Sequence, residues 1–213
     1  MGSPLPPVRK IAAEWLVKKG AKIDSELLNL LQNGRRDQRI GALHAINTLK
    51  ITSFTKPLLK IIIDEREDNW VREKSILTFA QMTNAVDHTQ LLIDLILKNK
   101  HQDIFGKLDI ALGKTLNHIL YPNLYSHIKD KNSFYKSVAV LLDHKHQNGR
   151  GAGMSLLKKI PLEDLQYIAK KMLYVIEDKD RTYTSYHGDS HRQLGLEILY
   201  GLGIKETIGL TVN

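Results

Sequence analysis

The chain has 213 residues, of which 42% are hydrophobic and 25% charged, and its formal net charge is +8 at pH 7. This length can bury a full hydrophobic core, and the absence of cysteine excludes disulfides, cysteine-ligated zinc and thiol catalysis. No apolar run approaches the roughly 18 residues of a membrane span, so we expect no membrane partner.

Apolar residues recur at helical spacing along most of the chain. Residues 1–7 lack the features of a signal peptide, and we interpret them as a disordered or cloning-derived lead-in that leaves the cellular compartment unknown. Asn33 and Gly34 are predicted to turn the chain, and either Asp68 or Asn69 is predicted to cap the helix over 70–82. We predict helices over 8–19, 24–32, 37–50, 56–64, 70–82, 91–98, 103–120, 133–144, 152–159, 162–176 and 190–202. The connection 177–189 is the longest and most polar, and such loops often carry function.

Two of these helices recur together. Residues 23–31 match residues 54–62 at an offset of 31, and 39–49 match 72–82 at an offset of 33. Recurrence of a helix pair at such a period is the sequence mark of a helical repeat protein. The predicted core comprises Leu27, Leu28, Leu31, Leu43, Ile46, Leu58, Ile62, Ile76, Phe79, Leu92 and Leu95.

A basic residue stands near the start of the second helix of each predicted pair. These residues are Arg9, Arg39, Arg72, Lys107, Arg150 and Arg192. All except Lys107 are followed three positions later by a small residue, namely Ala12, Ala42, Ser75, Gly153 and Gly195. We expect the small residue to let two helices approach closely and the basic side chain to reach the preceding inter-helix turn.

This pattern over residues 8–203 resembles HEAT repeats, whose consensus has an aspartate in the turn and an arginine in the second helix. The acid here is not at one fixed spacing, and Lys107 lacks the small partner. The resemblance implies an all-α fold, a right-handed solenoid of about five helix pairs with the second helices lining the concave face. We expect residues 8–213 to form one repeat domain, which we interpret as a segment of a longer protein.

Four clusters raise chemical hypotheses. His144 and His146 with Asp143, and His187 with Asp189 and His191, have metal-binding residue types, but neither has a complement at a recognised spacing. Residues 183–187 combine tyrosine, serine and histidine, which is no catalytic triad without the geometry. The glycine-rich residues 148–153 could meet an anion, but a tight inter-helix turn is favoured. We therefore predict no metal, no cofactor and no catalytic site.

Trp70, Val71 and Arg72 resemble the helix starts of HEAT-like alkylpurine DNA glycosylases, which are basic and of comparable length. No segment matches the Trp-Trp-Asp type of that family, and Trp15 and Trp70 are the two tryptophans. The positive charge is also dispersed, because residues 51–100 carry as many acids as bases. Both observations argue against a role of Trp70 in binding DNA. We therefore predict that Trp70 packs between repeats.

The resemblance to HEAT repeats implies a non-enzymatic scaffold that binds a protein or peptide along its concave face. Two alternatives stay open: a nucleic-acid-binding domain of glycosylase type, and an accessory repeat domain of a larger enzyme. The candidate partner-binding residues are the presumed exposed positions of the second helices and the long loop. They are His44, Asn47, Lys74, Thr78, Gln81, Tyr183, Tyr186 and His187.

Overall fold

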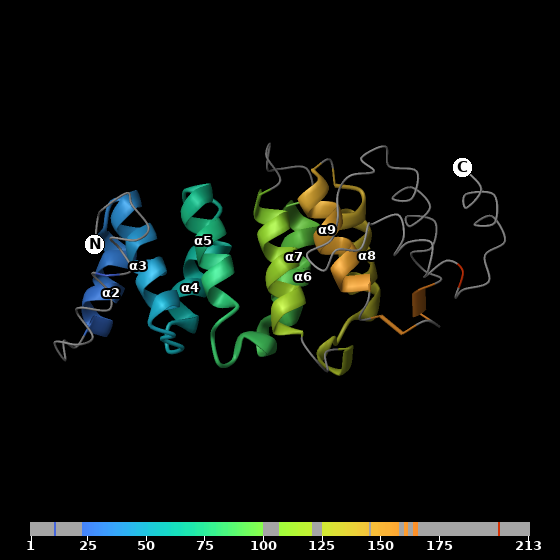
Figure 1. The fold of residues 1–213 in the computed structure, drawn as a ribbon, viewed down its shortest axis with the longest axis horizontal. Coiled ribbons are helices and arrows are strands. Elements are labelled where there is room, and N and C mark those ends of the chain that lie inside the picture. The colour runs from blue at the N-terminus through green and yellow to red at the C-terminus, as the bar shows by residue number, and fades with distance from the viewer. Residues whose placement is uncertain are drawn as a thin grey trace. The chain divides into compact units, whose positions relative to one another are not determined.

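The computed structural model describes residues 23–99, 107–120, 125–144, 146–157, 160–161 and 164–165, together with Ile11 and Tyr200. Every regular element in these ranges is a helix, so the all-α prediction is confirmed for them (Figure 1). The helices predicted over 8–19, 162–176 and 190–202 lie almost wholly outside these ranges. The loop 177–189, with Tyr183, Tyr186 and His187, lies outside them entirely.

The chain divides into two compact units, Met1–His88 and Thr89–Asn213. The first unit contains α2 (Ile23–Asn33), α3 (Arg36–Thr48), α4 (Thr55–Ile63), α5 (Asn69–Phe79) and the 3-10 helix η1 (Ala85–His88). The second contains α6 (Thr89–Asn99), α7 (Lys107–Ile119), the 3-10 helix η2 (Tyr125–His127), α8 (Lys131–Leu142) and α9 (Gln147–Leu157).

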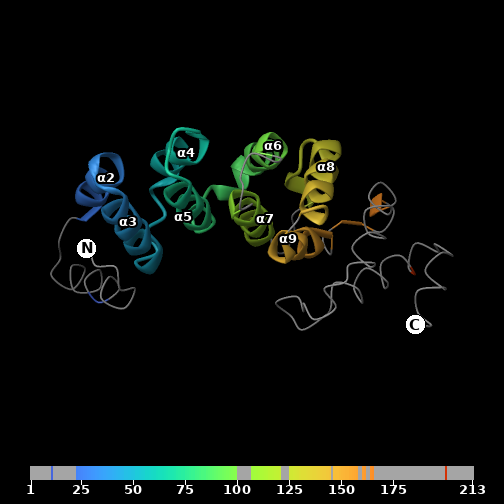
Figure 2. The same ribbon diagram turned by 90° about the horizontal axis from the view of Figure 1, so that it is seen from above.

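Each unit is built from helix hairpins. In the first unit, α2 packs on α3 and α4 on α5, and the second helices α3 and α5 pack on each other (Figure 2). In the second unit, α6 packs on α7 and α8 on α9, with additional contacts between α6 and α8 and between α7 and α9. Within each unit, the pairing predicted from the sequence repeat is therefore present.

Ten of the eleven predicted core residues are buried. The exception is Leu28, which is only partly buried. Ile23, Leu27 and Leu31 are the buried residues of α2 and follow one another at intervals of four. Leu28 lies about 100° around the helix axis from Leu27, so it leaves the inward face.

Helix α3 ends in a Schellman motif. The amide of Ile51 donates to the carbonyl of Ile46 at 3.0 Å, and the amide of Lys50 donates to the carbonyl of Asn47 at 3.2 Å. Lys50 has a φ of 52°, the left-handed conformation that glycine adopts without a Cβ penalty.

Replacing Lys50 with glycine is expected to raise the free energy of unfolding by about 0.5–1 kcal/mol, because the cap geometry no longer strains a side chain. Urea denaturation of wild type and Lys50→Gly checks this. The exposed Lys60→Gly, within helix α4, serves as the opposite control, because glycine inside a helix is destabilising by roughly the same amount.

The predicted start of α9 is wrong. The glycine-rich residues 148–153 were predicted as an inter-helix turn, but they lie within helix α9 (Gln147–Leu157). The glycines here serve close packing. A Cβ on Gly149 would lie 2.3 Å from Cγ of His144, and one on Gly153 would lie 3.0 Å from the backbone nitrogen of Leu142. A glycine-rich composition predicts a turn. In the structure, the contacts of Gly149 and Gly153 with His144 and Leu142 require small residues within a helix.

Candidate binding surface

Two of the basic residues at the second-helix position reach back to the preceding helix or turn: Arg72 binds the end of α4, and Arg150 binds the turn after α8 as predicted. The guanidinium of Arg72 donates from Nε and Nη2 to the carbonyl of Ile62, at 3.3 and 3.2 Å, although Arg72 is only 5% exposed. Arg150 donates from Nη1 to the carbonyl of His144 at 3.0 Å. Each arginine therefore binds a backbone carbonyl near the end of its own first helix. Such carbonyls have no partner within the helix, and cations are favourable there.

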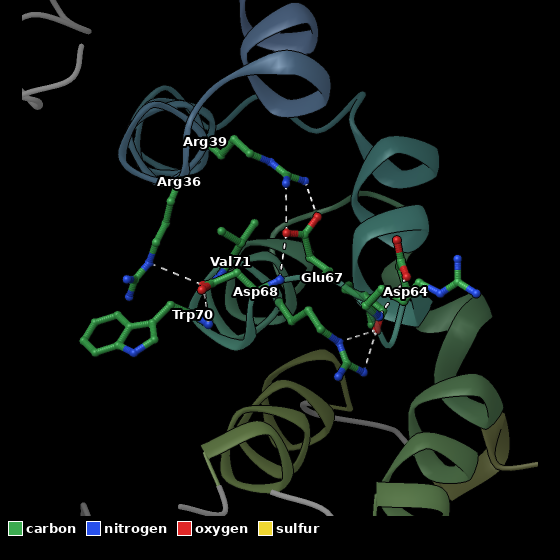
Figure 3. Close-up of polar contacts among 10 residues, drawn as sticks. Arg36, Arg39, Asp64, Glu67, Asp68, Trp70 and Val71 are labelled. Atoms are coloured by element: carbon green, nitrogen blue, oxygen red, sulfur yellow. Dashed lines mark hydrogen bonds and ion pairs between the residues drawn. The ribbon is translucent and has the colours of Figure 1, made fainter.

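Arg39 behaves differently. Its guanidinium binds the carboxylate of Glu67 through two nitrogens, one of them Nη1 at 2.8 Å from Oε1 (Figure 3). Glu67 lies between α4 and α5, so Arg39 of α3 reaches the turn of the following hairpin rather than its own. The side chains are 17% and 12% exposed, which makes this a largely buried, bidentate ion pair.

Asp68 continues this link between the hairpins. Its carboxylate caps α5 by accepting from the amides of Trp70 at 2.9 Å and Val71 at 3.1 Å, as the sequence predicted. The same carboxylate lies 3.4 Å from Nε of Arg36 on α3 (Figure 3). Glu67 and Asp68 together therefore hold the start of α5 against α3.

Trp70 lies at the outer edge of this arrangement. The Cζ atom of Arg36 is 5.4 Å from the centroid of the indole ring, which is cation–π distance. Trp70 therefore contacts the neighbouring hairpin, but it is 46% exposed and is not a core residue. The prediction that it serves only packing between repeats is incomplete.

Helices α3 and α5 each present a row of partly or fully exposed side chains at helical spacing, and these rows define the α3–α5 surface. On α3 the row consists of Arg36, Ile40, His44 and Asn47. On α5 and just beyond it consists of Trp70, Lys74, Leu77 and Gln81. The two helices pack side by side, and the contact of Arg36 with Trp70 joins the rows at one end.

Four of the predicted partner residues, His44, Asn47, Lys74 and Gln81, lie in these rows. Thr78 does not, because it is only 4% exposed, and its predicted exposure is wrong. Thr78 follows Val71 and Ser75 at intervals of seven and three, and both of those residues are buried. Thr78 was predicted as an exposed position of its helix, whereas the partly exposed Ile40 and Leu77 were not among the predicted residues.

The described residues of the helical part of the first unit, 23–88, have no excess of charge. Residues 23–88 contain nine Lys and Arg and nine Asp and Glu. The net charge of +8 therefore comes from the rest of the chain. The balance of charge over residues 23–88 gives this segment no net attraction for polyanions.

A polar cluster in the second unit was not predicted. The hydroxyl of Tyr125 donates to the carboxylate of Asp164 and also shares a hydrogen bond with Tyr135. Nζ of Lys131 lies 4.4 Å from the centroid of the Tyr125 ring and 3.7 Å from Oδ2 of Asp164.

Burial, together with the hydrogen bond to Asp164, raises the pKa of Tyr125 well above its usual value. The hydrogen bond from Tyr125 lowers the pKa of Asp164. The cluster ties Asp164 to α8, and its members are too far apart in sequence to form a motif.

The histidine cluster at residues 143–146 makes backbone contacts. Nδ1 of His144 accepts from the amide of His146 at 3.0 Å, and Nδ1 of His146 accepts from the amide of Asn148 at 3.2 Å. Across the described ranges, no three histidine, aspartate or glutamate side chains are grouped closely enough to hold a metal ion. These two imidazoles therefore act as hydrogen-bond acceptors in the turn between α8 and α9.

Comparison with protein-family models, curated proteins and solved structures gave no match. Within the described part of the chain, no helix combines the length and apolar character needed to cross a membrane. The resemblance to HEAT repeats thus stays a prediction.

Proposed function

We propose that this protein is a non-enzymatic scaffold of HEAT type, whose helix pairs form a right-handed solenoid and which binds a protein or peptide. Its binding site is the α3–α5 surface. The observation that carries the proposal is that Trp70, Ile40 and Leu77 are partly exposed in two adjacent rows of polar side chains. Aromatic and apolar anchors inside a polar surround are typical of protein interfaces.

The contacts beneath this surface support a preorganised site. The pair of Arg39 with Glu67 and the cap made by Asp68 fix α5 against α3. A partner would therefore meet two helices already held in register, and little conformational entropy would be lost on the scaffold side. Asn47 and Gln81, both exposed, offer amide donors and acceptors for orienting a partner's backbone.

The test uses peptides selected from a random display library on the 213-residue chain. We expect Trp70→Ala and Leu77→Glu each to weaken binding of a selected peptide at least tenfold, because truncation of an interface anchor typically costs 2 kcal/mol or more. The matched control is Lys60→Glu, an exposed residue of α4, which should leave the affinity unchanged. Unchanged binding in both anchor variants would overturn the proposal.

Salt dependence separates this function from nucleic-acid binding. Because residues 23–88 carry equal numbers of acids and bases, peptide affinity should vary little between about 50 mM and about 200 mM salt. Fluorescence anisotropy with labelled peptide, duplex DNA and RNA measures this. Tight binding of duplex DNA or RNA that falls steeply over the same range would favour the nucleic-acid alternative instead.

A further inference from the structure

His146 occupies the N-cap position of α9. It immediately precedes Gln147, the first residue of the helix, and its carbonyl accepts from the amides of Gly149 at 2.9 Å and Arg150 at 3.4 Å. Its ring nitrogen Nδ1 accepts from the amide of Asn148 at 3.2 Å. The imidazole therefore performs the role that a serine, threonine, aspartate or asparagine oxygen usually performs at a helix start.

Histidine differs from those residues because it is the residue type whose ordinary change of charge falls between about pH 5 and pH 8. Nδ1 can accept from Asn148 only while it has a free lone pair, so the cap requires the neutral ring with its proton on Nε2. Protonation removes the acceptor. It also places a positive charge at the N-terminus of α9, where the helix dipole disfavours cations.

His144 is less sensitive to this change. Its Nδ1 accepts from the amide of His146 at 3.0 Å, but it also lies 3.3 Å from the carbonyl oxygen of His146. A protonated ring can therefore donate to that oxygen. The ring also packs against Gly149, where an added Cβ would lie 2.3 Å from Cγ. Protonation of His144 would still remove the acceptor for the amide of His146, but the acceptor for the first turn of α9 is the ring of His146.

Charged groups of both signs lie at the corner between α8 and α9. Arg150 donates to the carbonyl of His144 at 3.0 Å and so adds positive charge to the corner, whereas the exposed Asp143 at the end of α8 adds negative charge. Asp109 is buried in the first turn of α7, which packs on α9. The remaining titratable groups described on α6, α7 and α8 are the exposed Asp94, Lys98, Lys114, His118, Lys131 and Lys136 and the buried Tyr135.

We propose that the corner between α8 and α9 is a proton-sensitive element, in which neutral His146 holds the start of α9 closed and protonated His146 releases it. This is a regulatory property separate from the binding proposed for the α3–α5 surface. Mild acidification would loosen the first turn of α9 while leaving the helices of the first unit in place.

The experiment compares amide hydrogen-exchange protection factors of Asn148 and Arg150 at about pH 7.5 and about pH 5.5 by NMR. In the wild type we expect protection to fall about fivefold at the lower pH, since a side-chain cap contributes about 1 kcal/mol. In His146→Asn, which keeps a capping oxygen and cannot titrate, protection should be the same at both pH values. His118→Asn, an exposed histidine of α7, should behave as the wild type.

A second readout addresses the tautomer directly. Nitrogen-15 shifts of the His146 ring should show an unprotonated Nδ1 and a protonated Nε2 at neutral pH. An equal fall in protection in wild type and His146→Asn would overturn the proposal. So would a ring that carries its proton on Nδ1 at neutral pH, because that ring could not accept from Asn148.

Discussion

Phe79→Ala is expected to lower the free energy of unfolding of the first unit by about 4 kcal/mol. Phe79 is 0% exposed at the end of α5, and its ring packs edge-on against His88 with centroids 5.8 Å apart. Removing it deletes apolar contacts and leaves a cavity in the middle of a small core, where the surrounding helices can collapse only in part. Native-state hydrogen exchange on α4 and α5 measures the loss.

Leu28→Ala is the matched control for that variant. Leu28 belongs to the same predicted core but is only partly buried, so its truncation should cost about 1 kcal/mol. The account of the core would be contradicted if Phe79→Ala and Leu28→Ala were equally destabilising.

Arg39→Ala is expected to lower the free energy of unfolding by about 3 kcal/mol. It leaves the carboxylate of Glu67, whose side chain is 12% exposed, without its bidentate partner, and removing one member of a largely buried pair strands the other. The double variant Arg39→Met with Glu67→Leu should recover most of this loss, because apolar side chains of similar volume often replace such a pair at little cost. Urea denaturation of the wild type, Arg39→Met, Glu67→Leu and the double variant completes the double-mutant cycle.

Arg36→Ala provides the contrast. Its ion pair with Asp68 involves side chains that are 52% and 40% exposed, and such pairs contribute at most about 1 kcal/mol. If Arg36→Ala and Arg39→Ala had equal small effects, and the double-variant cycle showed no coupling, the link that we assign to Arg39 and Glu67 would be refuted.

The helix pairs and most of the core could be predicted because their causes are local. Apolar residues at helical spacing fix which face is buried, and a cap such as Asp68 lies within three residues of the amides that it binds. The contacts of two second-helix arginines were also predictable, since Arg72 and Arg150 each lie close in sequence to the carbonyl that they bind.

The remaining features depend on residues distant in sequence. Arg39 and Glu67 are 28 residues apart, and Tyr125 and Asp164 are 39 apart, so no spacing rule pairs them. The glycines of α9 were predicted to form a turn. Their small size is explained only by the contacts of Gly149 with His144 and of Gly153 with Leu142, which the sequence does not show. The candidate surface was partly predictable. Its polar residues follow from the helix period, whereas the exposure of Trp70 depends on tertiary packing.

The most direct test of the proposed scaffold is hydrogen exchange of the chain with and without a library-selected peptide. We predict added protection on α3 and α5, with α2 and α4 unchanged, because the peptide would lie across the rows that contain Ile40 and Leu77. Protection confined to α2 and α4 would place the binding site elsewhere and contradict the assignment of the α3–α5 surface.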